Sequence, residues 1–142
     1  MIINTKYHGE YETSDGEVLH FPKGIPGFPD EKQFVIIPLE ADDTFMILQS
    51  VKTFELAFVL INPFQYFPNY DFTLDETTIE KLAIHSPEDI AVYSILTVHD
   101  PFEKTTANLQ APVIINLKNK RGKQVILNID TYTTRHNIMN KR

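Results

Sequence analysis

Cysteine is absent from the 142-residue sequence. That absence excludes a disulfide scaffold, a thiolate metal site, a cysteine nucleophile and an iron–sulfur cluster. Long apolar runs are also absent, because the longest ones, such as residues 57–61, have only the length of a strand and are too short to cross a bilayer. The first residues lack the apolar core of a secretion signal. We therefore expect a cytoplasmic protein with no membrane segment.

Positive charge is scarce. The chain holds 13 Lys and Arg residues against 19 Asp and Glu residues, for a formal net charge of −6 with histidine neutral. The imbalance lies in the first half, because residues 1–71 hold 4 bases and 11 acids, whereas residues 72–142 hold 9 bases and 8 acids. A net acidic domain repels phosphate backbones. We expect no direct binding of nucleic acid, and a basic protein is the more natural partner.

The hydrophobic pattern is mostly that of strands, and the length of the chain suits a single domain over residues 1–142. Val, Ile, Phe and Tyr dominate short segments that turn residues separate. One helix is predicted near residues 75–84, where Asp75 can cap the first turn. The sequence therefore predicts a mainly β fold, a compact β-barrel-like domain with one or two short helices. The predicted strands lie near residues 34–39, 45–51, 56–61, 91–98, 113–117 and 124–129.

Turn residues predict two hairpins. Residues 1–13 alternate loosely as a strand does, and the Ser-Asp-Gly turn at residues 14–16 predicts that residues 17–21 return against this first strand. Residues 118–123 predict a second hairpin turn, in which Gly122 takes a positive φ angle. The polar tail from about residue 132 is weakly patterned, and we expect it to be flexible at its end.

Signals for catalysis or cofactor binding are weak throughout. The five histidines show no metal-ligand spacing, and no serine lies in a nucleophile elbow. The loop at residues 22–29 holds three prolines and two glycines, but it lacks the Lys and the Ser or Thr of a phosphate cradle. Three carboxylate pairs lie at predicted turns or helix starts, where solvation explains them: Asp42-Asp43, Asp75-Glu76 and Glu88-Asp89. We expect no catalytic residue, no metal site and no cofactor.

Three segments leave a role in binding open. Residues 64–72 hold five aromatic side chains, which either pack inward or leave an exposed remainder for a protein interface. Residues 105–112 are rich in small and amide side chains, so Asn108 and Gln110 bond either the loop itself or a partner. The basic turn at residues 118–123 is either an RNA contact or a solvated hairpin tip. The lack of interleaved aromatic residues favours the tip.

Specific motifs follow one another over nearly the whole chain. They are FPKGIPGF at residues 21–28, LQS at 48–50, AFVLINP at 57–63, PNY at 68–70, TANLQAPVIIN at 106–116 and GKQVIL at 122–127. With these motifs the chain resembles the bacterial flagellar assembly factor family FliW. The glycine–proline loop and the Asn-Leu-Gln-Ala-Pro segment are the most specific parts of the likeness.

The resemblance implies a non-enzymatic regulator with a compact β-barrel-like fold. Such proteins bind flagellin in the cytoplasm, in the manner of a chaperone, and they also bind the translational regulator CsrA, which represses flagellin messenger RNA. The two partners compete, so secretion of flagellin frees the regulator to capture CsrA, and translation resumes. A small-ligand-binding β-barrel is the alternative, because barrels hold ligands and the aromatic residues could line a pocket. A hydrolase is a distant third.

The resemblance also suggests where partners bind, because loops on a rigid scaffold often carry binding groups. The residues that we expect at or beside the partner-binding surface are Ile25, Phe28, Tyr70, Phe102, Asn108, Leu109 and Gln110. The alternative is that Ile25, Phe28 and Leu109 simply close the ends of the barrel. We expect alanine at Asn108 or Gln110 to weaken binding with little loss of thermal stability.

Overall fold

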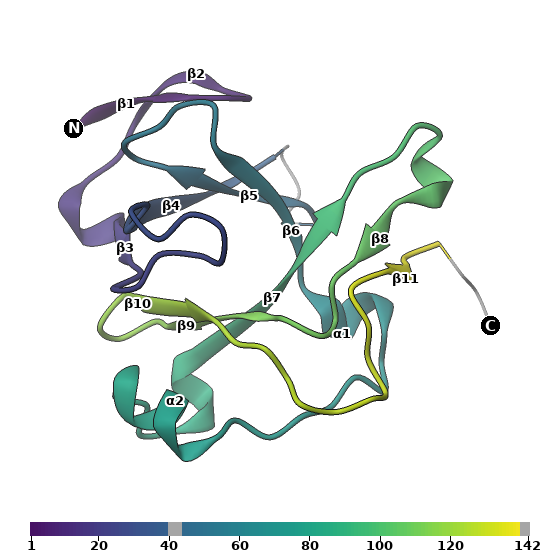
Figure 1. Cartoon of the computed structure of the whole chain (residues 1–142). Helices are drawn as coiled ribbons and strands as arrows, with labels where there is room; N and C mark the ends of the chain where they lie inside the picture. The colour runs from purple at the N-terminus through teal and green to yellow at the C-terminus, as the bar shows by residue number, and fades with distance from the viewer. Residues whose placement is uncertain (40–43, 140–142) are drawn as a thin grey trace.

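A closed barrel forms the centre of the computed structural model, which describes residues 1–39 and 44–139. Within these residues, seven strands build it: β3 (Leu19–His20), β4 (Gln33–Pro38), β5 (Met46–Ser50), β6 (Ala57–Ile61), β7 (Ile90–Thr97), β9 (Val113–Asn116) and β10 (Arg121–Gln124). The order around the ring is β7–β6–β5–β4–β3–β10–β9, and the pairing of β7 with β9 closes it (Figure 1). The neighbours are antiparallel except β10 and β3, which run parallel.

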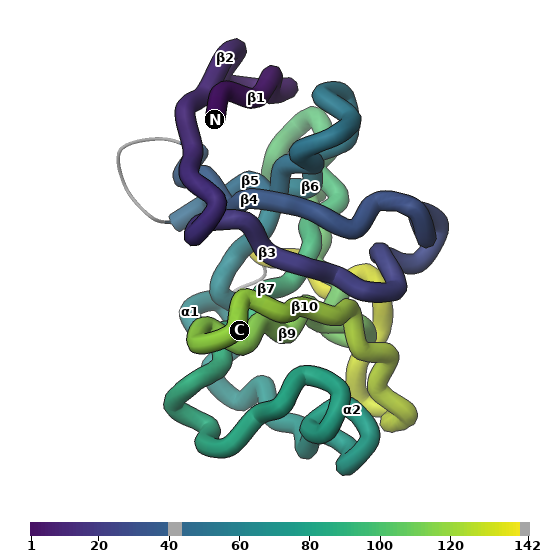
Figure 2. The backbone as a smooth tube through the Cα atoms, turned by 90° about the vertical axis from the view of Figure 1, so that its left-hand side faces the viewer, coloured from purple at the N-terminus to yellow at the C-terminus, as the bar shows by residue number. Residues whose placement is uncertain are grey.

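Smaller elements surround the barrel. Two strands at the N-terminus form a separate hairpin, and Figure 2 shows it at the opposite end of the molecule from α2. Strands β8 and β11 continue the sheet beyond β7. Among residues 1–39 and 44–139, no helix is long and apolar enough to span a membrane. The elements are β1 (Ile2–Thr5), β2 (Gly9–Glu12), β8 (Thr106–Ala107), β11 (His136–Asn137), α1 (Pro63–Tyr66), α2 (Glu76–Lys81) and the 3₁₀ turns Asp15–Glu17, Pro87–Asp89 and Phe102–Lys104.

Apolar side chains from all sides of the barrel fill its interior. The rings of Phe21 and Phe34 meet edge to face, with their centroids 5.2 Å apart, and neither ring is exposed to solvent. The same cluster includes Leu48, Leu60 and Val113. Burial of such side chains is the main force that stabilises a fold of this size. A second cluster, next to α1 and β8, contains Ile61, Tyr70, Leu96, Ala107, Leu109 and Ile138.

The predicted fold class is confirmed, and most of the predicted strands are confirmed as well. The segments predicted near 34–39, 45–51, 56–61, 91–98 and 113–117 correspond to β4, β5, β6, β7 and β9. Asp75 caps α2 as predicted, because its carboxylate accepts a hydrogen bond of 3.0 Å from the Thr78 amide. The helix ends earlier than predicted, at Lys81, because Ala83 takes a φ of 53° and Asn116 bonds the carbonyl of Leu82.

The strand predicted near residues 124–129 is wrong. The last strand of the barrel, β10, begins at Arg121 and ends at Gln124. The turn closes earlier because Lys120, and not Gly122, takes the positive φ angle of 63°. Gly122 lies within the strand, where a Cβ atom would come within 2.6 Å of the Phe21 ring. The glycine is therefore required by close packing rather than by a turn.

The predicted pairing of residues 17–21 with the first strand is also wrong. β1 pairs with β2, and a tighter turn at residues 6–8 joins them. The hydroxyl of Thr5 donates a hydrogen bond of 2.7 Å to the carbonyl of Gly9 and accepts one of 2.9 Å from the His8 amide. Leu19 is buried in the barrel, and its strand β3 pairs with β4 and β10 instead.

The aromatic segment and the C-terminal segment contain more regular secondary structure than their sequences indicate. The residues after Asn62, predicted as a loop or edge, begin with α1, because the Asn62 side chain accepts a hydrogen bond from the Phe64 amide. Residues 132–139 include β11 and the buried Ile138, so this part of the tail packs against the body. The predicted acidic turn at residues 40–43 lies outside the described residues.

Candidate functional site

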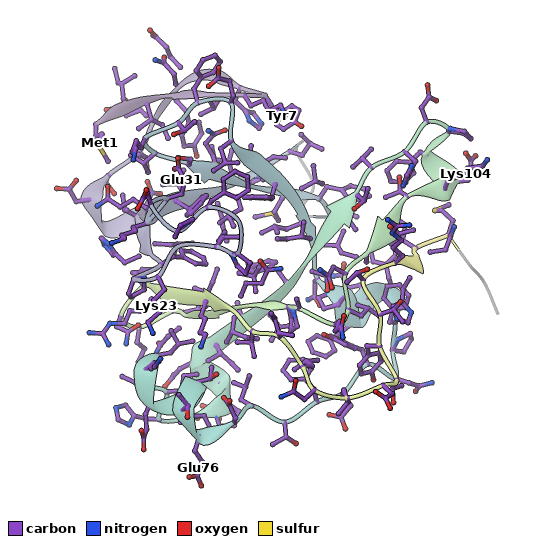
Figure 3. The ribbon with its side chains drawn as sticks, viewed as in Figure 1. Met1, Tyr7, Lys23, Glu31, Glu76 and Lys104 are labelled. Atoms are coloured by element: carbon purple, nitrogen blue, oxygen red, sulfur yellow. The ribbon has the colours of Figure 1, made fainter. Side chains whose placement is uncertain are left out.

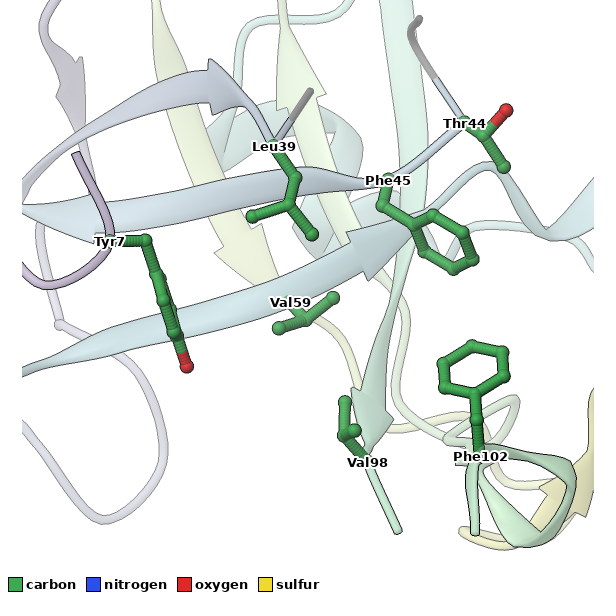
Figure 4. Close-up of a pocket in the computed structure, with 7 residues that line it drawn as sticks. All are labelled: Tyr7, Leu39, Thr44, Phe45, Val59, Val98 and Phe102. Carbon is green, nitrogen blue, oxygen red and sulfur yellow. The ribbon is translucent and has the colours of Figure 1, made fainter. Parts of the chain in front are cut away.

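An apolar cleft of about 450 Å³ opens where three separate parts of the chain meet. The first part is the β1–β2 turn, which contributes Tyr7. The second part is the adjoining strands β4 to β6, where the facing ends of β4 and β5 contribute Leu39, Thr44 and Phe45 and β6 contributes Val59. The third part is the arm, residues 98–105, which leaves the end of β7 and contributes Val98 and Phe102. Figure 4 shows these side chains around the cleft. None of the described lining residues carries a charge.

The cleft presents aromatic and aliphatic surface to solvent. The rings of Phe45 and Phe102 meet edge to face, with centroids 5.8 Å apart, across the gap between β5 and the arm. Phe102 is nevertheless 39% exposed, and Tyr7 and Val98 are 48% and 52% exposed. Exposed apolar side chains that converge on one concavity are typical of a surface that another molecule covers.

The arm holds Phe102 in place through its own hydrogen bonds. The Thr105 amide donates a bond of 2.8 Å to the Phe102 carbonyl, and the Thr105 hydroxyl accepts one of 3.0 Å from the His99 amide. Thr105 is fully buried, whereas its two partners His99 and Phe102 are exposed. Figure 3 shows Tyr7 and Lys104 on the two sides of the gap between the N-terminal hairpin and the arm. The arm forms one wall of the cleft.

Charged side chains do not line the described part of the cleft. The described part of the chain has no group of three or more His, Asp or Glu side chains placed to hold a metal ion. The lowered pKa of Glu31 comes from hydrogen bonds that Ser50 and Thr53 donate to its carboxylate, each 2.6 Å long, and these bonds tie a loop to β5. This carboxylate has a structural function.

Cations from separate segments meet at the end of the barrel near α2. The Arg121 guanidinium donates a hydrogen bond of 3.2 Å to the carbonyl of Lys81. The positive charges of Lys23 and then of Lys123 lower the pKa of Lys81. Such a shift means that positive charges crowd one another. The basic turn predicted at residues 118–123 is thus part of a larger cationic patch.

The residues predicted to bind partners do not form one site. Phe102 lines the cleft, whereas Phe28 is 41% exposed elsewhere, where its ring lies 6.0 Å from that of Phe58. Ile25 and Leu109 are buried. Burial is what the alternative interpretation expects, in which these residues close the ends of the barrel.

Tyr70 is buried as well. Asn108 bonds its own loop, because its side-chain oxygen accepts hydrogen bonds from the amides of Gln110 and Ala111, at 3.1 and 3.0 Å. Gln110 is half-buried beside it.

Sequence reasoning missed Tyr7, Phe45 and Val98 as site residues. Phe45 has the pattern of a buried strand residue, and Tyr7 lies in a segment that was expected to be strand. Residues so far apart in the sequence meet only once the barrel has closed and the N-terminal hairpin has folded over it. No local pattern could have identified them.

Comparisons with known proteins agree with one another. A family model described as "FliW protein" matches residues 2–138. The flagellar assembly factor FliW of Geobacillus kaustophilus is 55% identical over 138 residues, which is 97% of this chain and 95% of the relative. That of Bacillus subtilis is 52% identical, with 97% and 96% covered. A crystal structure of the flagellar assembly factor FliW superposes with a TM-score of 0.94 at 50% identity, over 100% of this chain and 99% of the other.

Proposed function

Because the chain belongs to the FliW family of flagellar assembly factors, we propose that it binds flagellin in the cytoplasm as a chaperone and, when free, binds and antagonises the translational regulator CsrA. Capture of CsrA relieves repression of flagellin messenger RNA, so translation follows the demand for flagellin. The protein acts by binding and not by catalysis. The observation that carries the proposal is the likeness to flagellar assembly factors over 97% of the chain.

Packing supports a protein partner over a small ligand inside the barrel. Phe21, Phe34 and Leu48 have no exposed surface, and the interior that they fill is where a ligand-binding barrel would keep its cavity. The apolar cleft lies outside the barrel wall and is open to solvent. We infer that it accepts apolar side chains of flagellin or of CsrA, with Phe102 as its main contact.

Charge supports an indirect action on RNA. The net charge of −6 repels phosphates, and an RNA-binding regulator must present basic surface to them. An acidic protein docked beside that surface drives RNA away by repulsion or by bulk. Docking of oppositely charged partners is also faster at low salt. The cationic patch near α2 is the feature that argues against this mechanism, because it offers a local site for phosphate.

A binding titration tests the proposal. Purified flagellin and purified CsrA are each titrated against the wild-type protein and against Phe102→Ala. The matched control is Phe54→Ala, because Phe54 is also an exposed ring, 51% accessible, but is not among the residues that line the cleft. We expect both partners to bind the wild type, and Phe102→Ala to weaken at least one of them while Phe54→Ala weakens neither. Failure of the wild type to bind either partner would refute the proposed function.

A further inference from the structure

A second pocket, of about 500 Å³, lies between α1 and the C-terminal segment that carries β11. Figure 1 shows that segment, in yellow, beside α1. The walls of the pocket are aromatic. Tyr66 and Phe67 come from the end of α1, and Tyr132 and His136 come from the C-terminal segment. Tyr70, 4% exposed, also lines the pocket.

The rings stand at steep angles to one another and do not stack flat. Phe67 and His136 have centroids 5.9 Å apart and an interplanar angle of 77°, and Tyr70 and Tyr132 are 4.7 Å apart at 75°. Tyr132 and His136 are 6.1 Å apart at 62°. In each pair the edge of one ring lies against the face of the other, and these rings line the pocket together. Ring faces carry negative electrostatic potential, which attracts a cation.

The histidine of this pocket is neutral. Its Nε2 atom accepts a hydrogen bond of 2.9 Å from the Thr133 amide, so that nitrogen carries no proton. Burial also lowers the pKa of His136. At neutral pH the ring therefore adds a π face and no positive charge. None of the described lining residues is charged.

Two exposed acids are next to lining residues in the chain. Asp71 follows Tyr70, and its amide donates a hydrogen bond of 2.9 Å to the Tyr132 hydroxyl. Asp130 is exposed and directly precedes Thr131, another lining residue. Arg135, next to His136 in the chain, is the one base in this stretch of the C-terminal segment. Two exposed acids adjacent in the chain to residues of an aromatic pocket favour a positively charged occupant.

We propose that this pocket, lined by Tyr66, Phe67, Tyr70, Tyr132 and His136, takes the guanidinium or ammonium end of an arginine or lysine side chain of a basic protein partner. The inference rests on the proposed function only in assigning the cation to a protein. A nucleic-acid base could also stack on such rings. The two neighbouring acids and the net charge of −6 oppose the phosphates that would accompany a base, so we favour the cationic side chain.

Small probes test the pocket without a partner. We would titrate the protein with N-methylguanidinium, with neutral N-methylurea of nearly the same shape, and with uridine monophosphate, and follow the backbone amides of Asp71 and Thr133 by NMR at pH 7.5. We expect saturable shifts of both amides with N-methylguanidinium alone. Equal shifts with N-methylurea would overturn the inference in favour of nonspecific polar binding. Shifts with uridine monophosphate alone would overturn it in favour of a base site.

Variants at Phe67 distinguish the contribution of its aromatic ring to cation binding from that of its apolar volume. Phe67→Leu keeps an apolar side chain without a π face, and Phe67→Tyr keeps the ring. We expect Phe67→Leu to weaken N-methylguanidinium binding by about threefold to tenfold, and Phe67→Tyr to leave it unchanged. In a parallel titration, Phe67→Leu should weaken CsrA binding by about the same factor, whereas Phe54→Leu should not.

The two proposals fail in different ways. If the wild type binds neither flagellin nor CsrA, the proposed function fails, whatever the small probes show. If N-methylguanidinium does not bind, or if Phe67→Leu binds it as tightly as the wild type does, the pocket inference fails while the proposed function stands.

Discussion

The hydroxyl of Tyr70 donates a hydrogen bond of 2.7 Å to the backbone carbonyl of Leu109, 39 residues further along the chain. Both residues are buried, with 4% and 1% of their surface exposed. Burial raises the pKa of Tyr70, so the hydroxyl keeps its proton and stays a donor. The bond joins two motifs that carry the family resemblance, PNY at residues 68–70 and the Asn-Leu-Gln-Ala-Pro segment. It gives the tyrosine of the first motif a structural role.

Replacement of Tyr70 by phenylalanine tests this bond. Tyr70→Phe keeps the ring but leaves the buried Leu109 carbonyl without its partner, so the free energy of unfolding should fall by about 1–3 kcal/mol. Urea denaturation followed by circular dichroism measures the change. Tyr7→Phe is the control, because Tyr7 is 48% exposed and should lose almost nothing. Equal stability of Tyr70→Phe and the wild type would contradict the assignment.

Replacement of Asn108 by alanine should reduce stability. The structure gives its side chain two bonds to loop amides, so the expectation of an intact fold with weaker binding applies better to Gln110. We expect Asn108→Ala to lose about 1 kcal/mol of unfolding free energy or somewhat more. The matched variant Gln110→Ala should lose less. Thermal melts of the two proteins compare them directly, and a larger loss in Gln110→Ala would reverse the assignment.

Gly122 should not tolerate even a methyl group. In Gly122→Ala the new Cβ would lie 2.6 Å from the Cζ atom of Phe21, inside the filled barrel. Overpacking of this kind costs about 1–3 kcal/mol. Gly16→Ala is the control, because a Cβ atom there meets nothing within 4 Å. In Gly122→Ala with Phe21→Leu the two losses should be less than additive, which a double-mutant cycle would show.

Stability should depend on pH through Glu31. Hydrogen bonds from Ser50 and Thr53 lower the pKa of its carboxyl below the ordinary value of 4.5. A lowered pKa in the folded state means that the stabilisation is present above the unfolded value and is lost as pH falls through the folded value. Glu31→Gln should therefore show a weaker decline in stability below pH 4.5. Denaturation at a series of pH values from 7 to 3 would test this, and an unchanged slope would contradict it.

Gel shifts test the indirect action on RNA. Labelled flagellin leader RNA is mixed with this protein alone, with CsrA alone and with both. We expect no tight binding by this protein alone and release of RNA from CsrA when both are present, because acidic surface repels phosphate. Added flagellin should restore the CsrA–RNA band. Tight, salt-sensitive binding of RNA by this protein alone, abolished by Lys23→Ala with Lys123→Ala, would instead assign the RNA contact to the cationic patch.

The sequence predicted those parts of the fold that depend on local pattern. Strands β4 to β7 and β9 follow from β-branched and aromatic runs, and the α2 cap follows from one aspartate. The pairing of β3 could not be predicted, because its two residues carry no pattern and its neighbours β4 and β10 are chosen by the packing of the barrel. The cleft could not be predicted from the sequence for the same reason, because its residues meet only in the folded barrel. Phe102 was predicted as a binding residue because it lies in a family-like loop. Phe45 and Tyr7 were not, because their segments had the pattern of strands.

The parallel pairing of β3 with β10 determines when the barrel can close while the chain is being synthesised. It joins His20 to Arg121, about 100 residues apart, and the His20 amide bonds the Lys120 carbonyl at 2.7 Å. Until the ribosome has released residue 121, nothing can seal that side of the barrel, and Phe21 and Phe34 stay open to water on the nascent chain. A ribosome-bound chain that ends before β9 should therefore be sensitive to protease, and protection should appear only when the last strand has emerged.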